Sequence, residues 1–296
     1  MYAITGANGH LGRLVLKHLL SQVPANQIIA TSRDPGKLED IASLGVIVRR
    51  ADFAEPSTLM AAYAGATSLL IISTFVAGKT FELHKAAISA AGSAGVSHLV
   101  YTSTPNAEPK SGNPLLADHG KTEVALAESG IRWTALRNGY YSEFLKNFLD
   151  FLLVKNRFLL PEGLSRHPWI SREDCARAAA GALLGKLKTA GTIDVTGPEA
   201  LSFADLASRM VSLSEHQIAA QTLTDSEIIA EVVKKGVTAE VAASTMRLIS
   251  WISRESAVSP TDAVELASGI KPEPVDVVLG ELVRTKREEI RNLGRG

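Results

Sequence analysis

Three glycines near the start of the chain have the spacing of a phosphate-binding turn. In "GANGHLG", Gly6, Gly9 and Gly12 stand between a short apolar run and an amphipathic helical segment. Gly6 permits a sharp turn, Gly9 lets the backbone approach a diphosphate, and Gly12 allows the helix to pack tightly on the strand. The N–H groups at the helix start, at the positive end of its dipole, would then bind the phosphates. The pattern predicts a dinucleotide site, and the alternative is a tight turn without a ligand.

The end of the second apolar run indicates which dinucleotide binds. An acidic residue there would accept a hydrogen bond from the 2′-hydroxyl of NAD. The run ends in "ATSRDPGK", which puts Arg33 at this place and Lys37 four residues later, while the turn at Pro35 is expected to point Asp34 elsewhere. A guanidinium matches a 2′-phosphate in charge and in bidentate geometry. We therefore predict NADP(H), and the alternative is that Arg33 is a solvated arginine at a strand end.

Polar and aromatic residues also end the next two apolar runs. Ligands of open parallel sheets bind at the carboxyl ends of the strands. Asp52 and Phe53 are expected to flank the adenine, and Ser73 and Thr74 to lie at the same edge of the sheet. A serine at a strand end is also common as a turn residue.

The usual acid–base pair of hydride-transferring enzymes with this architecture is absent. None of the five tyrosines is followed four residues later by a lysine. No histidine, cysteine or carboxylate set has metal-ligand spacing, and no serine stands in a nucleophile-elbow pattern. A protein with this sequence would transfer hydride without that pair, or would bind the cofactor without catalysis.

The elements that must position these residues alternate along the chain. Near-continuous apolar runs such as "TSLLIIST" are separated by helical segments such as "GRLVLKHLLSQV". Strands of this kind belong to a parallel sheet that is covered on both faces. Because the crossovers are right-handed, we predict an α/β fold with a Rossmann-like, doubly wound parallel sheet.

After Asn138 the alternation breaks. Residues 139–168 gather aromatics and leucines, a helix and a strand resume in 169–200, and the chain from Leu201 onward is mostly helical. We predict a first domain of residues 1–138 plus 169–200. A smaller, mostly helical substrate domain would consist of residues 139–168 plus 201–296.

The composition is that of an ordinary globular protein. Of the 296 residues, 46% are apolar, and 31 basic residues balance 31 acidic ones. No overall charge therefore favours nucleic acid or an anionic membrane, and no apolar run reaches the ~20 residues of a membrane span. Met1 leads straight into an apolar run, so we expect no export signal. The single cysteine, Cys175, fits a buried position in a reducing compartment, and we expect a cytoplasmic location.

Seven blocks of the chain, in order, resemble the NmrA-like family of atypical short-chain dehydrogenases. The likeness covers residues 1–210, and within the family it is strongest to type-two NAD(P)H:quinone oxidoreductases and triphenylmethane reductases. The family also contains NADP-binding regulators that catalyse little or nothing. The blocks are "ITGANGHLG", "SRDPGK", "RRADF", "LLIIST", "HLVYTS", "HGKTEVALAESGI" and "LRNGYYSEF".

The resemblance implies roles for particular residues. Arg33 would hold the 2′-phosphate, and Ser73 and Thr74 would line the ribose region. Lys121, in "HGKTEV", would contact the nicotinamide ribose. The phosphate loop would consist of Gly6, Asn8, Gly9, His10, Leu11 and Gly12. The edge of the nicotinamide and substrate pocket would be formed by Asn138, Gly139, Tyr140 and Tyr141.

A quinone substrate would make the missing acid tolerable. The hydroquinone anion is only modestly basic, so solvent can deliver the proton, and stacking on the nicotinamide supplies effective concentration. A cation or hydroxyl can stabilise the developing oxyanion. We predict Lys121 as this cation or as a ribose anchor, with Tyr140 or Tyr141 as a hydrogen-bond donor. The alternative for Lys121 is a solvated helix lysine.

Two further groups of residues have two interpretations each. Phe144, Phe148 and Phe151 share one helical face and, with Phe158, either wall a flat apolar site or form core, and core is the favoured interpretation. His119 is either a proton donor with a pKa near neutrality or a capping or packing residue near a helix start.

The sequence therefore supports three hypotheses about function. The first is an NADPH-dependent reductase of quinones or similar flat electrophiles. The second is a non-catalytic NADP(H)-binding redox sensor that docks on a regulatory protein, and the third is a tailoring reductase of secondary metabolism. A small molecule is the expected partner of a reductase, and the sequence leaves a homodimer open.

Overall fold

The computed structural model describes residues 1–155, 157–188, 190–213 and 219–293, and these form two compact units. The first unit comprises Met1–Gly139, Arg172–Thr196 and Thr261–Pro272. The second comprises Tyr140–Ser171, Gly197–Pro260 and Glu273–Gly296. Within the described residues, no helix combines the length and the apolar character that crossing a bilayer requires.

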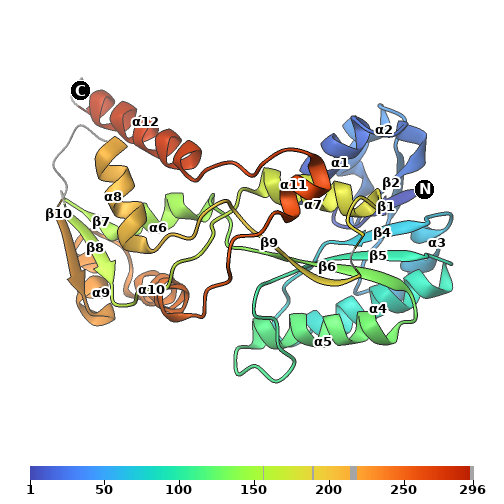
Figure 1. Cartoon of the computed structure of the whole chain (residues 1–296), viewed down its shortest axis with the longest axis horizontal. Helices are drawn as coiled ribbons and strands as arrows, with labels where there is room; N and C mark the ends of the chain where they lie inside the picture. Colours follow the sequence, from blue (N-terminus) through green and yellow to red (C-terminus); the bar gives the residue numbers. More distant parts are fainter. Residues whose placement is uncertain (156, 189, 214–218, 294–296) are drawn as a thin grey trace. The chain divides into compact units, whose positions relative to one another are not determined.

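A parallel sheet lies at the centre of the first unit. Among the described residues it has seven strands in the order β3-β2-β1-β4-β5-β6-β9 (Figure 1). From β1, the sheet continues through β2 to β3 on one side and through β4, β5 and β6 to β9 on the other. The switch point therefore lies between β1 and β4. The doubly wound sheet predicted from the sequence is confirmed. The strands are β1 Tyr2–Ile4, β2 Ile28–Ser32, β3 Ile47–Arg50, β4 Ser68–Ile71, β5 His98–Ser103, β6 Arg132–Asn138 and β9 Gly191–Val195.

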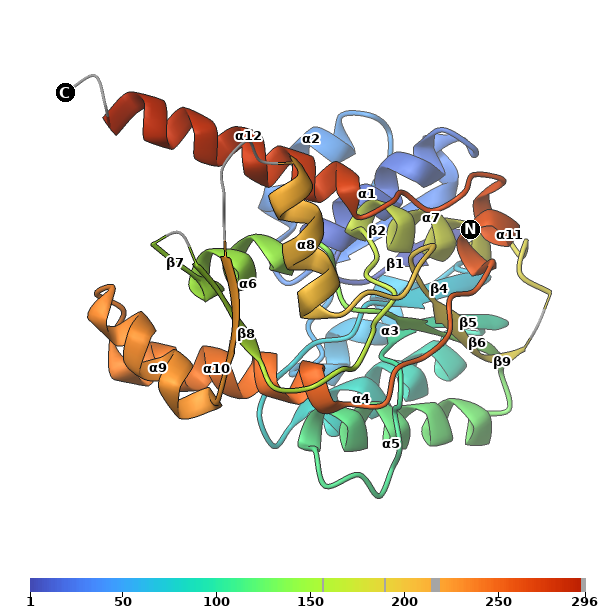
Figure 2. The ribbon, with the colours of Figure 1, turned by 60° about the vertical axis from the view of Figure 1, so that its left-hand side comes forward.

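Helices cover both faces of this sheet. One face carries α1 (His10–Leu20), α7 (Arg172–Leu183) and α11 (Ala263–Ser268), and the other carries α4 (Thr80–Ser93) and α5 (Pro114–Glu128) (Figures 1 and 2). Leucine and valine recur on one side of α1, which buries that side and leaves the other to solvent. The short elements of this unit are η1 Ala25–Gln27, η2 Pro35–Leu38, α2 Glu39–Ala42, η3 Pro56–Thr58 and α3 Leu59–Tyr63.

The first unit includes a segment of the chain beyond residue 200, where the predicted first domain ends. Residues 261–272 were assigned to the second domain, but they return to the first unit through α11, which packs on α7. A Cβ atom on Gly181 of α7 would lie 2.1 Å from the carbonyl oxygen of Ala267. Thr261 ties the returning chain to β9, because its hydroxyl donates to the carbonyl oxygen of Asp194 at 2.7 Å.

The second unit is mostly helical and contains a small sheet that the sequence analysis did not predict. In this sheet β8 pairs in parallel with β10 and antiparallel with β7. Phe148, Phe151 and Phe158 are buried in the core of this unit, whereas Phe144 is 41% exposed. The core interpretation is therefore confirmed for three of the four phenylalanines. The elements are α6 Phe144–Leu152, β7 Leu153–Val154, β8 Arg157–Pro161, α8 Phe203–Leu213, β10 Ala219–Leu223, α9 Asp225–Lys234, α10 Ala239–Arg254 and α12 Asp276–Leu293.

Candidate cofactor site

A cavity of about 490 Å³ opens in the first unit at the carboxyl ends of β1 to β4. This is the switch point of the sheet, where the two halves of the strand order diverge and leave a crevice for a ligand. Eight of the residues predicted to bind a cofactor line it. They are Gly6, Asn8, Gly9, Arg33, Asp52, Phe53, Ser73 and Thr74.

The glycine turn has the geometry that a dinucleotide needs. Gly6 has a φ of +60°, a conformation that other residues rarely adopt. A Cβ atom on Gly12 would lie 2.4 Å from the carbonyl oxygen of Gly6, so only glycine lets α1 start this close to the turn. Gly9 caps α1, and among the residues that the structure describes no side chain bonds to the N–H groups at this helix start. Those bare amides fit a diphosphate.

Hydrogen bonds hold the turn against the neighbouring strand β2. The N–H of Ala7 donates to the carbonyl oxygen of Thr31 at 3.0 Å. The Ser32 hydroxyl donates to Oδ1 of Asn8, also at 3.0 Å, and accepts from the N–H of Asp34 at 3.1 Å. The phosphate turn and the end of β2 therefore form one hydrogen-bonded wall of the cavity.

Arg33 stands on this wall as an exposed cation. In the described part of the chain its guanidinium has neither an ion-pair partner nor a hydrogen bond. The neighbouring Asp34 uses its carboxylate to accept from the N–H of Gly36 at 3.2 Å, as its position before Pro35 led us to expect. Arg13 is occupied elsewhere, since it pairs with Asp40 at 2.7 Å. Arg33 therefore fits a 2′-phosphate by charge and by availability.

Two further features of the cavity depend on tertiary contacts. Lys79, which precedes α4, lines the cavity and was missed, because no sequence pattern marks a lysine in the segment after β4 as a ligand. Asp52 accepts from the N–H of Ala54 at 3.0 Å, which fixes its carboxylate on the cavity wall. Phe53 packs edge-on against the buried ring of His84, with ring centroids 6.5 Å apart.

The remaining predicted residues of the first unit lie outside the cavity lining. His10 is exposed at the start of α1, Leu11 and Gly12 are buried within that helix, and Asn138 is buried at the end of β6. The lysines are exposed. Lys37 lies 3.9 Å from the Asp34 carboxylate and Lys121, on α5, lies 3.7 Å from that of Asp118.

His119, on α5, is buried beside Tyr101. It is 6% exposed, and its Nδ1 lies 2.7 Å from the hydroxyl of Tyr101. Burial lowers the pKa of His119 to about 4, so the ring is neutral at pH 7. Cys175 is likewise buried, within α7, as its apolar surroundings in the sequence indicated.

The two tyrosines predicted to be catalytic belong to the second unit. The Tyr140 hydroxyl donates a hydrogen bond to the Glu255 carboxylate, and burial, with this bond, raises the pKa of the phenol. Trp251 stands edge-on to Tyr140, with ring centroids 5.9 Å apart. Tyr141 is half-buried and its ring lies 5.9 Å from that of Phe144.

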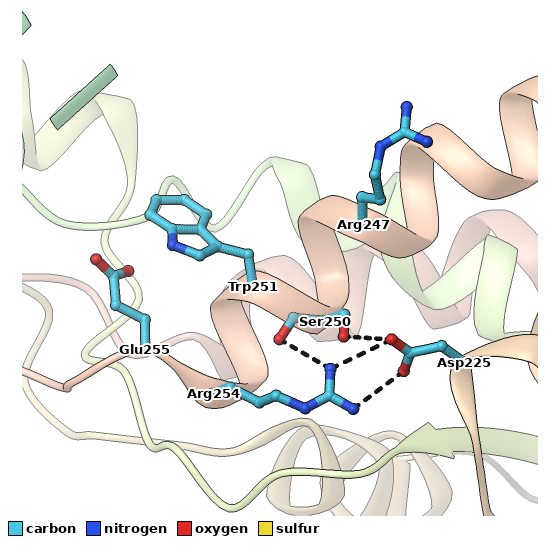
Figure 3. A pocket seen from close by; sticks show the side chains of 6 residues that line it. All are labelled: Asp225, Arg247, Ser250, Trp251, Arg254 and Glu255. Carbon is cyan, nitrogen blue, oxygen red and sulfur yellow. Dashed lines mark hydrogen bonds and ion pairs between the residues drawn. The ribbon is translucent and has the colours of Figure 1, made fainter. Parts of the chain in front are cut away.

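A surface cavity of about 390 Å³ lies beside Trp251 and Glu255 (Figure 3). Ser250 and Arg254 of α10 converge on Asp225 at the start of α9, at 2.6 Å and 3.2 Å. Figure 3 shows that these polar groups bind one another. They hold α9 and α10 together, which is a structural role.

Sheet, glycine turn and cavity together define the class of protein: an α/β protein with a doubly wound sheet and a cavity at its switch point, the place where such sheets bind dinucleotides. A family model described as NAD(P)H-binding matches residues 6–185. The chain belongs to this NAD(P)H-binding family. The prediction of a nicotinamide cofactor is thereby confirmed.

Three known proteins show which members of the class this chain is similar to. It is 36% identical to quinone oxidoreductase 2 of Escherichia coli over 80% of this chain and 82% of that one. The crystal structure of that enzyme with NADPH covers 95% of this chain and 99% of its own, with a TM-score of 0.82. Triphenylmethane reductase of Citrobacter sp., solved with NADP(H), gives a TM-score of 0.81 at 30% identity over 96% of this chain and 99% of its own. An NAD(P)H azoreductase of Xenophilus azovorans is 29% identical over 71% of this chain and 72% of that one.

These relatives confirm the resemblance stated from the sequence blocks. They are reductases, so the predicted class, an NAD(P)H-dependent reductase, is confirmed, and the non-catalytic sensor is not favoured.

Proposed function

We propose that this chain is an NADPH-dependent reductase that transfers hydride to a quinone or a similarly flat electrophile. One observation carries the choice of NADPH: Arg33 stands at the cavity beside the phosphate turn, with its charge unpaired within the described residues. The similarity to a quinone oxidoreductase supports the choice of substrate.

In this proposal the chain's own residues bind and orient the cofactor. The N–H groups at the start of α1 bind the diphosphate, and Arg33, with Lys37 nearby, neutralises the 2′-phosphate. Asp52 and Phe53 contact the adenosine, while Ser73 and Thr74 line the ribose side. When bound, NADPH supplies a hydride to the electrophile, and solvent supplies the proton that completes its reduction.

The catalytic roles of Lys121, Tyr140 and Tyr141 stay proposals based on the family resemblance. Lys121 is exposed, and its ammonium lies 3.7 Å from the Asp118 carboxylate. An exposed ion pair of this kind is weak, so the ammonium can reorient toward a ligand. Tyr140 can donate to a substrate only by leaving Glu255. Lys121→Ala, Tyr140→Phe and Tyr141→Phe each remove one donor, and the fall in kcat identifies the one that the reaction uses.

The experiment is an assay of NADPH oxidation with a panel of quinones, an azo dye and a triphenylmethane dye. We expect turnover well above the rate without protein, fastest with a quinone, and slower turnover when NADH replaces NADPH. Binding of NADPH in calorimetry with no turnover across the panel would instead support the sensor. A homodimer and a cytoplasmic location also stay predictions, to be tested by light scattering and by fractionation.

A further inference from the structure

Side chains, rather than the main chain, bind three consecutive backbone amides in the wall of the cofactor cavity. These amides belong to residues 72–74, which follow β4 and line the cavity. The three acceptors are the residue that follows β1, a residue of β5 and a residue of α4. The bonds are Ile72 N–H to Thr5 Oγ1 at 2.9 Å, Ser73 N–H to Thr102 Oγ1 at 2.8 Å and Thr74 N–H to His84 Nε2 at 3.0 Å.

His84, on α4, is 0% exposed. Its Nε2 accepts from the amide of Thr74, so the proton of the neutral ring is on Nδ1. Nδ1 lies 3.1 Å from the Thr122 hydroxyl oxygen. The Thr122 hydroxyl donates its hydrogen bond to the carbonyl oxygen of Asp118 at 2.7 Å, so toward His84 it can only accept one. The surroundings therefore select one tautomer.

A second histidine completes the cluster from α5. The hydroxyl oxygen of Tyr101, on β5, lies 3.2 Å from His84 Nδ1 and 2.7 Å from His119 Nδ1. Tyr101 can thus accept from His84 and donate to His119. Burial lowers the pKa of His84 to about 3, with His119 as a further cause, so both rings stay neutral at physiological pH.

We propose that His84 is a positioning residue for the bound cofactor: its Nδ1–H tautomer holds the Thr74 amide and thereby keeps residues 72–74 in the shape that lines the cofactor cavity. The inference rests on the proposed function in that the cavity binds NADPH. Without an acceptor the buried side of this amide would be unsatisfied, and the wall would move to reach water.

Two substitutions at His84 distinguish the role of Nε2 from that of Nδ1. His84→Gln places an amide oxygen near the position of Nε2, where it can accept from Thr74, whereas His84→Asn reaches only the position of Nδ1. We expect NADPH to bind His84→Asn about tenfold more weakly than wild type and His84→Gln within about twofold. Both variants disturb the core similarly, so a merely structural role would weaken binding equally in the two.

A second readout requires no cofactor. In the ligand-free protein we expect the Thr74 amide to exchange its hydrogen faster in His84→Asn than in wild type or His84→Gln. If wild type binds no NADPH, the proposed function fails, yet this comparison still decides the role of His84 in holding the wall. Equal Thr74 exchange in both variants, or NADPH affinity lost equally in both, would overturn the inference.

Nitrogen NMR chemical shifts of the His84 ring provide a third readout. They are measured on the wild-type protein, so misfolding of a variant cannot affect them. We expect a proton on Nδ1 of His84 and none on Nε2. A proton on Nε2 would leave that atom unable to accept from Thr74 and would overturn the inference.

Discussion

At the scale of single residues, the choice between the two nicotinamide cofactors depends on the end of β2. Arg33 and Asp34 are neighbours of opposite charge, but their environments differ. The carboxylate of Asp34 is turned toward the backbone of its own turn, where it accepts from Gly36. Arg33 instead lines the cavity. A cation that faces a ligand cavity without a protein partner favours a ligand with an extra negative charge.

Arg33→Ala should therefore weaken NADPH binding by about 1–3 kcal/mol and leave NADH binding nearly unchanged, because only NADPH carries the 2′-phosphate. Isothermal calorimetry with each cofactor measures the difference. Lys188→Ala is the matched control, since it removes one positive charge from an exposed site of the same unit that does not line the cavity. Equal losses for both cofactors would show that Arg33 does not contact the phosphate.

At the scale of elements, α4, α5 and β5 enclose neutral histidines. Burial lowers the pKa of His84 to about 3, and those of His119 and His98 to about 4. In the unfolded chain each has its ordinary pKa of 6.5. The unfolded state therefore binds more protons than the folded state below pH 6.5, and acidification favours unfolding.

We expect the free energy of unfolding to be nearly constant above pH 7 and to fall by a few kcal/mol between pH 6.5 and pH 5. Urea denaturation at a series of pH values measures it. His119→Asn removes one titrating group and keeps an acceptor near the position of Nδ1, so its loss over this interval should be about 1–2 kcal/mol smaller than that of wild type. An identical pH dependence in the variant would contradict a neutral His119 in the folded protein.

At the scale of the whole molecule, each unit has a hydrophobic core of its own. In the first unit apolar residues from β1, β4 and β5 pack with those of α3 and α4, and in the second, residues of α6, β8, α8, α10 and α12 pack together. The residues that line the cofactor cavity all belong to the first unit. We therefore expect the stability of the second core and the affinity for the cofactor to vary separately.

Phe158→Ala tests this separation, because Phe158 is fully buried in the second core. It should lower the free energy of unfolding by about 3–5 kcal/mol through the cavity that it creates. At temperatures where the variant is folded, NADPH affinity should stay within about twofold of wild type. Phe144→Ala is the matched control, since that ring is 41% exposed and its loss should cost much less. A loss of affinity comparable to that of Arg33→Ala would contradict the separation.

Short-range patterns in the sequence determined the sheet, the glycine turn and the cofactor. The properties of Gly6, Gly12 and Arg33 depend on the few residues around them and on where each strand ends, and the order of strands and helices follows from the alternation. Eight predicted residues meet at one cavity because parallel strands bring their carboxyl ends to the same edge.

Only the tertiary structure decided what depends on contacts between distant residues. The pairing of β8 with the exposed strand β10, the return of α11 to the first unit and the bond from Tyr140 to Glu255 each join segments far apart in the chain. The cluster around His84 assembles from the segment after β4 and from α4, β5 and α5 in the same way. A local pattern carries no information about such partners, because the packing of the folded core brings them together.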